Sequence, residues 1–308
     1  MDTTLLLTTI EAIAKILIMV AVGMLAVKVH ILNEKETNAL AHFVINITSP
    51  MLLLSCFFDH GDPERMKGFL IALALGALMH IISIILGIVL VKKGTPTSEV
   101  EKMGITYGNV AFMGIPLVNA MLGEEAVFYL SAIIIMFNLF IWSHGMILMR
   151  GSMSKKDLLH VLTTPSMICI FIGIFIYVFR IPIPDIVRSP ITSIGSATTP
   201  VSMIVAGSIV IRSDLKAILK DKKTYLVSAL RLIVTPLLLL LFIKVFHITG
   251  VVAICAYVAS ACPIASLVTM FALEYKKSPD YIAGLFALTT ILSLATIPLM
   301  VMIYSLVG

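Results

Sequence analysis

The chain has 308 residues, of which 59% are hydrophobic and only 13% are charged, whereas roughly a quarter of the residues in soluble domains are charged. Its mean hydropathy of +1.08 excludes an ordinary water-soluble protein and predicts an all-α integral membrane protein. The net charge of +5 does not indicate a nucleic-acid partner, because the Lys and Arg residues lie in short loops between apolar runs rather than in one patch.

Apolar windows bounded by charged residues, Pro or Gly predict ten membrane-spanning helices. Helices are expected because backbone groups in hydrocarbon must be satisfied within the segment and the alternating pattern of a membrane β-barrel is missing. No polar stretch is long enough for a separate soluble domain, so one membrane domain is expected. The expected spans lie near residues 4–29, 37–58, 68–91, 103–122, 125–149, 161–180, 190–211, 225–246, 250–274 and 280–306.

The distribution of basic residues predicts the orientation of the chain. Of the 22 Lys and Arg residues, 15 lie in the loops that follow odd-numbered spans and 5 lie in the loops that follow even-numbered spans. Basic loops stay on the cytoplasmic side of a membrane. Both termini of this multi-pass protein are therefore expected on the non-cytoplasmic side of the cell (inner) membrane.

The two halves of the chain resemble each other, and five spans in each half give them opposite orientations. Thr48-Ser49-Pro50 in span 2 has a counterpart in Thr198-Thr199-Pro200 in span 7, and Pro116 in span 4 has one in Pro263 in span 9. Prolines are common in membrane helices, which is the simpler explanation. Matched interruptions in inverted repeats are nevertheless typical of secondary transporters, whose substrate site lies at the repeat interface. The expected repeats cover residues 1–150 and 151–308.

Span 4 is expected to be broken within residues 107–116, where Gly and Pro together disfavour an unbroken helix, and span 9 within residues 259–266 around Pro263. Pro116 removes an amide donor and crowds the carbonyl group four residues earlier, at Phe112. If the two helices open where they cross, half-helix N-termini face each other near the middle of the bilayer. Their partial positive charge suits a carboxylate or another anion. Irregular backbone at that depth is tolerated where it lines a cavity, so the breaks predict a binding site.

Three polar side chains are candidates for that site or for structural roles. The Asn109 amide can donate to a carboxylate, although an Asn in a membrane helix also serves to join helices. Ser49, beside Pro50, could supply a hydroxyl from span 2 or bond to its own helix. Arg231 in span 8 is conspicuous, because a charge inside the membrane is costly. Its position near the cytoplasmic start of the span leaves both a functional role and snorkelling to the interface open.

Other kinds of chemistry are not expected. The Glu residues within the predicted spans, among them Glu11 and Glu274, lie near span ends, and no Asp lies in the middle of a span. A cation antiporter or an intramembrane aspartyl protease needs such buried acids. The four Cys residues and the isolated His80 and His144 form no metal-binding pattern. The sequence therefore predicts no metal, no cofactor and no enzymatic activity.

Two segments resemble the auxin efflux carrier family. Residues 109–117, Asn-Val-Ala-Phe-Met-Gly-Ile-Pro-Leu, look like its broken span 4, and residues 271–280 are similar to the segment that closes span 9 in its PIN-type members. The ten-span layout fits this family over the whole chain. The resemblance implies a carrier of elevator or rocking type in which spans 1, 2, 6 and 7 form a scaffold and spans 3 to 5 and 8 to 10 move. It also implies a homodimer formed through the scaffold helices.

The resemblance also implies which residues bind the substrate. Asn109 matches the Asn that holds the substrate carboxylate, and Pro116 and Pro263 match the prolines at the helix crossing. Ser49 and Thr164 fall where scaffold residues line the site. With their neighbours, the expected substrate-binding residues are Ser49, Asn109, Gly114, Ile115, Pro116, Thr164, Cys262, Pro263 and Ser266.

The short connection from Arg150 to His160 resembles the prokaryotic branch of the family, since plant members have a long cytoplasmic segment there. Malate- or malonate-like carboxylates are associated with that branch. The expected function is therefore transport of small organic anions, such as mono- or dicarboxylates, by elevator-type alternating access. Two alternatives stay open: a sodium-coupled organic-anion symporter of bile-acid-symporter-like fold, and a membrane sensor that binds ligands without moving them.

Overall fold

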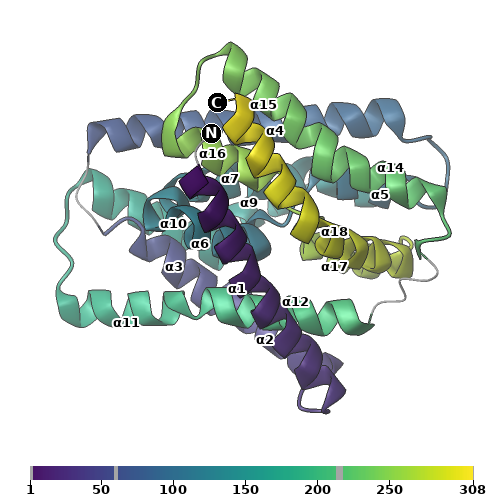
Figure 1. Ribbon diagram of the computed structural model, residues 1–308, viewed down its shortest axis with the longest axis horizontal. Coiled ribbons are helices and arrows are strands. Elements are labelled where there is room, and N and C mark those ends of the chain that lie inside the picture. The colour runs from purple at the N-terminus through teal and green to yellow at the C-terminus, as the bar shows by residue number, and fades with distance from the viewer. Residues whose placement is uncertain (1–2, 59–61, 213–217, 308) are drawn as a thin grey trace.

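The computed structural model describes residues 3–58, 62–212 and 218–307 (Figure 1). Within these ranges every regular element is a helix, which confirms the all-α prediction, and β-type pairing is confined to one isolated bridge. The α-helices are α1 (Thr3–Lys28), α2 (Glu34–Phe43), α3 (Ser49–Ser55), α4 (Pro63–Leu90), α5 (Ser98–Thr106), α6 (Ile115–Leu122), α7 (Glu124–Phe140), α8 (Met146–Arg150), α9 (Lys155–Thr163), α10 (Pro165–Val178), α11 (Asp185–Ser196), α12 (Thr198–Arg212), α14 (Lys222–Ala229), α15 (Thr235–Val245), α16 (Gly250–Ser260), α17 (Ser266–Glu274) and α18 (Pro279–Val307).

Six helical segments in the described part of the chain are long and apolar enough to cross a bilayer. They correspond to the second, third, fifth, seventh, eighth and tenth predicted spans. The first predicted span is α1, and the other three contain shorter apolar helices, Val110–Leu122, Pro165–Val178 and Gly250–Ser260. The six long segments are Glu34–Ser55, Pro63–Leu90, Glu124–Arg150, Asp185–Arg212, Lys222–Val245 and Pro279–Val307.

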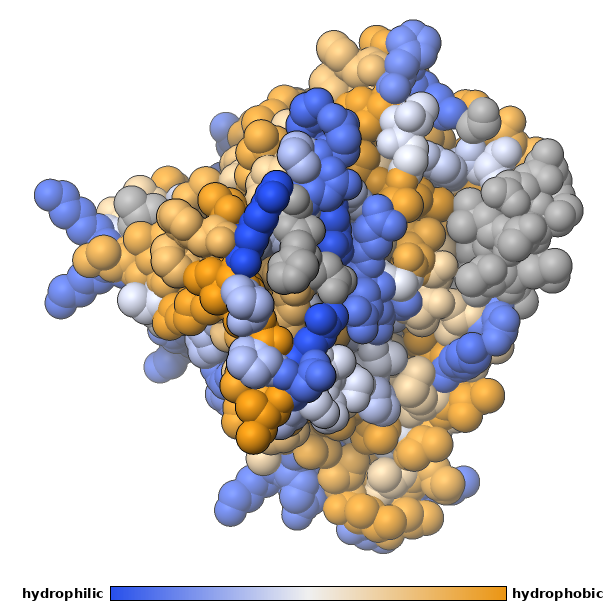
Figure 2. Space-filling model, turned by 90° about the vertical axis from the view of Figure 1, so that its left-hand side faces the viewer, coloured by the Kyte–Doolittle hydropathy of each residue, from blue (hydrophilic) through white to orange (hydrophobic). Residues whose placement is uncertain are grey.

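The outside of the helical bundle is strongly apolar. Large side chains such as Ile18, Val89, Leu241 and Phe246 are at least 60% exposed. Figure 2 shows broad hydrophobic areas on one side of the molecule, on both flanks of a central strip of hydrophilic residues. Exposed apolar surface of this extent is unfavourable in water and is satisfied by lipid chains. The protein is therefore a multi-pass membrane protein.

Four π-helical turns interrupt the described helices. They are η1 (Val44–Thr48), η2 (Val110–Gly114), η3 (Ile141–Gly145) and η4 (Leu230–Val234). Three of them are followed, two residues after their end, by a proline: Pro50, Pro116 and Pro236. Each proline lacks the amide that would bond to the carbonyl four residues earlier, at the centre of the turn, so the helix widens there. Such turns are rare and occur mostly at functional sites.

Helices α1 and α12 cross in direct backbone contact (Figure 1). The Ser208 hydroxyl donates to the Gly23 carbonyl at 3.3 Å. A Cβ atom on Gly23 would overlap the backbone of Ile204, and one on Gly207 would overlap the backbone of Val20. Glycines let membrane helices approach this closely, and the close approach provides van der Waals contact that lipid cannot replace. Predicted spans 1 and 7 are thus packed as a pair.

Replacing Gly207 by Ala is expected to destabilise this pair, because the new methyl group meets fixed backbone atoms rather than a flexible side chain. Overpacking of this kind costs about 1–3 kcal/mol. The thermal unfolding midpoint of the purified protein measures the effect. Gly87→Ala is the matched control, since its Cβ would lie 3.5 Å from Lys102 atoms, an ordinary contact. Equal midpoints for the two variants would contradict the close packing of α1 and α12.

Candidate functional site

Predicted spans 4 and 9 are both interrupted, and they cross at their non-helical segments, residues 107–109 and 261–265. Gly108 and Ile264 form the antiparallel bridge at the crossing. The segments thereby satisfy each other's backbone groups, which would be costly to leave unpaired in a membrane. Two further backbone hydrogen bonds flank the bridge, from Asn109 N–H to the Pro263 carbonyl at 2.7 Å and from Ala265 N–H to the Tyr107 carbonyl at 2.9 Å.

The break in span 4 lies at the start of residues 107–116, the segment in which the sequence predicts an interruption. Pro116 sits in the first turn of α6, where the chain is helical, and its effect is the π-helical turn η2 around Phe112. The helix opens at 107–109 instead. In span 9 the prediction of a break at Pro263 is confirmed, because Pro263 lies within the extended segment.

Asn109 begins the second half of span 4. Its side-chain oxygen accepts a hydrogen bond from the Phe112 N–H at 3.3 Å, which caps the helical segment that starts at Val110. Because an amide N–H can bond only to the oxygen, this contact fixes the orientation of the Asn109 amide. Its NH2 group is then left as a donor that the helix does not use.

A cavity of about 260 Å³ opens beside the crossing. Its walls come from spans 2, 4, 5, 6 and 9, so it joins both halves of the chain. Three of the four π-helical turns, η1, η2 and η3, contribute to it. The lining residues are Ile45, Asn46, Ser49, Asn109, Ala111, Phe112, Ile134, Phe137, Asn138, Trp142, Thr163, Thr164, Pro165, Ser166, Ala265, Ser266 and Leu267.

The cavity brings together four of the nine residues expected from the sequence: Ser49, Asn109, Thr164 and Ser266. They come from predicted spans 2, 4, 6 and 9. Thr164 also begins α10, where its hydroxyl oxygen accepts from the Met167 N–H at 3.4 Å. The other five are buried but do not line the cavity: Gly114, Ile115, Pro116, Cys262 and Pro263.

The sequence prediction missed several lining side chains. Asn46, Asn138 and Trp142 line the cavity from spans 2 and 5, and Ser166 and Thr163 lie beside Thr164 at the start of span 6. Two of these residues could have been identified from the sequence alone. Asn46 is four residues before Pro50, at the centre of a proline-induced π turn, and Trp142 is the single Trp of the chain. The π turn at Trp142 has no following proline, and the sequence gives no comparable sign of it.

Arg231 lies in the π-helical turn η4 and is completely buried. The snorkelling alternative is therefore wrong: the guanidinium points inward to the helix crossing and not to the surface of the protein. It donates to carbonyl groups on both broken spans. The bonds are Nε to Cys262 at 2.9 Å, Nη2 to Ser260 at 2.9 Å, and Nη1 to Ile105 at 3.2 Å and to Thr106 at 3.4 Å.

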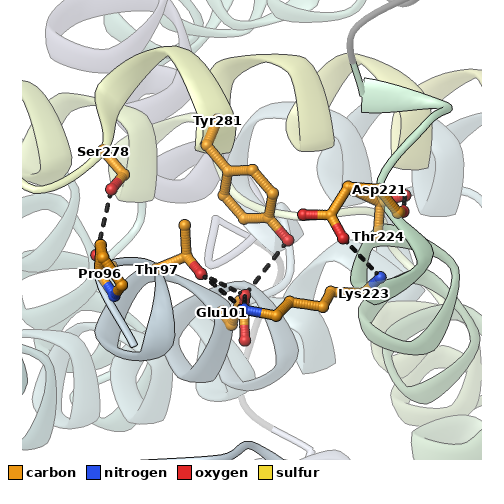
Figure 3. A network of polar contacts seen from close by, with 8 residues as sticks. All are labelled: Pro96, Thr97, Glu101, Asp221, Lys223, Thr224, Ser278 and Tyr281. Atoms are coloured by element: carbon orange, nitrogen blue, oxygen red, sulfur yellow. Dashed lines mark hydrogen bonds and ion pairs between the residues drawn. The ribbon is translucent and has the colours of Figure 1, made fainter. Parts of the chain in front are cut away.

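The buried acid of span 4, Glu101, lies in a separate cluster and not at the cavity (Figure 3). Helix α5 begins at Ser98, before the predicted start of the span, so Glu101 belongs to the helix. Its carboxylate accepts from the Thr97 hydroxyl at 2.6 Å and the Tyr281 hydroxyl at 3.4 Å, and Lys223 Nζ lies 3.7 Å away. This charge is thus balanced where α5, α14 and α18 meet.

The residues and helix ends around the cavity determine the sign of its electrostatic potential. Among the described residues that line it, none is Asp, Glu, Lys or Arg. Two helical segments begin at its edge, one after Asn109 and one at Ser266. The first amide groups of a helix have no partner within the helix and carry partial positive charge. Uncharged polar side chains share the wall with apolar ones such as Phe112 and Ile134, and the largely apolar surface strengthens electrostatic interactions inside.

Comparison with known proteins shows the family of the chain. The model of a family described as membrane transport protein matches residues 8–157 and 152–301 of the chain. A relative from Methanothermobacter thermautotrophicus, named an uncharacterized transporter, is 22% identical over 300 residues, which are 94% of this chain and 96% of the relative. Since the family match extends over far more than half of the chain, the protein belongs to the auxin efflux carrier family of membrane transport proteins.

Proposed function

We propose that this protein is a secondary transporter of small organic anions, with mono- or dicarboxylates as the substrate class. The observation that carries the proposal is the cavity at the crossing of spans 4 and 9. Two helix N-termini and the unused NH2 group of Asn109 meet there, and none of the described lining residues is acidic and would oppose an anion. Helix N-termini are ready-made anion sites.

The shape and chemistry of the cavity favour a small carboxylate over a large or cationic ligand. Its volume of about 260 Å³ is below the range of sites for drug-sized ligands, roughly 300–1,000 Å³. The hydroxyl groups of Ser49, Thr164 and Ser266 offer further donors around the amide of Asn109. Ile45 and Phe137 line other parts of the wall and suit the carbon chain of an organic acid.

The position of the cavity supports an elevator-type mechanism as part of the proposal. Asn46 and Ser49 of span 2 and Thr164 of span 6 belong to the proposed scaffold. Asn109 of span 4 and Ser266 of span 9 belong to the proposed moving group. A substrate bound between them contacts both groups, so displacement of one group against the other would carry it across the bilayer.

The proposal includes the placement of the protein. The basic loops after odd-numbered spans would face the cytoplasm, with both termini on the non-cytoplasmic side of the cell (inner) membrane. The closely packed α1 and α12 would be part of the scaffold through which two copies form a homodimer.

Two measurements on the purified full-length protein test this function. A thermal-shift screen against malonate, malate, succinate and monocarboxylates should find an acid that raises the unfolding midpoint, because a ligand of the native state stabilises it. Counterflow of the labelled acid into proteoliposomes then separates transport from sensing. Binding without counterflow would favour the sensor, and stabilisation by organic cations but by no organic acid would contradict the anion site.

A further inference from the structure

Arg231 lies at the helix crossing on a side that does not line the cavity. Its four acceptor carbonyls, on Ile105, Thr106, Ser260 and Cys262, all lie at or just past the C-terminal ends of α5 and α16. The crossing therefore has two sides of opposite partial charge, which we call its poles. At the N-terminal pole, helix N-termini face the cavity, and at the C-terminal pole, helix C-termini converge on the Arg231 guanidinium.

Helix C-termini carry partial negative charge, because their last carbonyl groups have no donor within the helix. Two such ends at one point need a cation. In carriers with discontinuous helices, this is where a coupling Na⁺ or proton is coordinated. Here five N–H donors of a permanently charged side chain are already present, and the rigid planar group can bond to several carbonyls at once.

The fit of the guanidinium leaves no space for a further ion at these carbonyls. Arg231 has no exposed surface, and a Cβ atom on Gly108 would overlap its Nη2 atom. Among the described ion pairs, none involves Arg231, so its charge is balanced by the backbone dipoles rather than by an acid. The Arg231 guanidinium can therefore stay at these carbonyl groups throughout a transport cycle.

We propose that Arg231 is a tethered cation that takes the place of a coupling cation at the crossing, so that the carrier requires no Na⁺ or other monovalent cation. The consequence for coupling rests on the proposed transport function, whereas the consequence for stability does not. Neutralising the C-terminal pole also leaves the N-terminal pole as the uncompensated charge that an anionic substrate would meet. Arg231 is thus a positioning residue that does not itself touch the substrate.

The test compares thermal unfolding midpoints of the substrate-free protein in Na⁺ and N-methylglucamine salts of equal ionic strength. The wild type is expected to show equal midpoints in both. Arg231→Ala is expected to unfold roughly 10 °C lower, because four buried carbonyls lose their donor. Millimolar Na⁺ or guanidinium, far below denaturing concentrations, is expected to restore part of that loss in a saturable manner.

Arg212→Ala is the matched control. Arg212 also holds two helices together, donating to the Leu32 carbonyl at 2.6 Å and to the Thr37 hydroxyl at 2.9 Å, but it does not lie at the crossing. It should lose stability without becoming dependent on a cation. Rescue of Arg231→Ala that is no larger than that of Arg212→Ala would overturn the proposal.

Arg231→Lys covers the case in which Arg231→Ala yields no folded protein. A Lys keeps the charge and is expected to be less stable than the wild type but equally indifferent to Na⁺. Saturable stabilisation by Na⁺ of the wild type or of Arg231→Lys would overturn the proposal. Because no organic anion is present, these results stand apart from any failure of the transport assays.

Discussion

Replacing Asn109 by Asp is expected to abolish transport of organic anions while the protein stays folded. Asp caps a helix as well as Asn does, so the hydrogen bond from the Phe112 N–H is retained. The NH2 donor, however, becomes a carboxylate oxygen that faces the substrate in a largely apolar cavity. Loss of a hydrogen bond to a charged group, about 1.5–3 kcal/mol, combined with like-charge repulsion predicts at least about 100-fold weaker binding.

Ligand-induced thermal shift and counterflow in proteoliposomes measure this change, and the midpoint without ligand verifies the fold. Asn119→Asp is the matched control, since Asn119 lies on the same span in α6 but does not line the cavity. The control is expected to keep uptake within about twofold of the wild type, because the half-buried Asn119 lies near the C-terminal end of α6 and outside the cavity lining. Wild-type uptake by Asn109→Asp would remove Asn109 from the binding site.

Gly108→Ala is expected to disrupt the helix crossing itself. The added Cβ would overlap the guanidinium of Arg231, which is held by four carbonyls and is unable to move aside without losing them. The backbone of Gly108 is held in turn by its bridge to Ile264. Overpacking combined with a disturbed buried charge predicts a loss of about 3–5 kcal/mol, seen as a much lower unfolding midpoint or as failure to recover folded protein.

A control and a double variant make this result specific. Gly114 lies on the same span with an ordinary helical backbone, and its Cβ would be 3.4 Å from the Cys262 sulfur atom, so Gly114→Ala should keep the wild-type midpoint. In an Arg231→Ala background the overlap disappears, and Gly108→Ala should cost much less. Equal costs in both backgrounds would show that the two residues are not coupled.

Much of the fold could be predicted because membrane insertion depends on local properties. Hydrophobic run length and the backbone's need for internal hydrogen bonds determine that these segments are helices in lipid. Proline chemistry is equally local. Three prolines each remove one backbone amide donor, and a π-helical turn ends two residues before each of them: Pro50, Pro116 and Pro236. The sequence also identified Asn109 and Ser49, because polar residues beside such interruptions are conspicuous in an apolar chain.

The exact position of the break within residues 107–116 of span 4 could not be predicted from local chemistry. Pro116 widens the helix without opening it, whereas the chain opens at residues 107–109, where no proline stands. The opening there is held by pairing with residues 261–265, more than 150 positions away in the sequence. A contact of that kind has no signature in either segment alone, because each supplies only half of the hydrogen bonds.

What the sequence by itself determined is that the chain crosses a membrane in helices and interrupts two of them with Pro and Gly residues. Only the tertiary structure decided which side chains share the cavity, because Asn138, Trp142 and Thr163 meet Asn109 solely through helix packing. It also decided the role of Arg231. A lone charge in an apolar span can snorkel or point inward, and the outcome depends on whether other segments present enough carbonyl groups to hold it. Here two helix ends do so, and the charge is buried at the helix crossing.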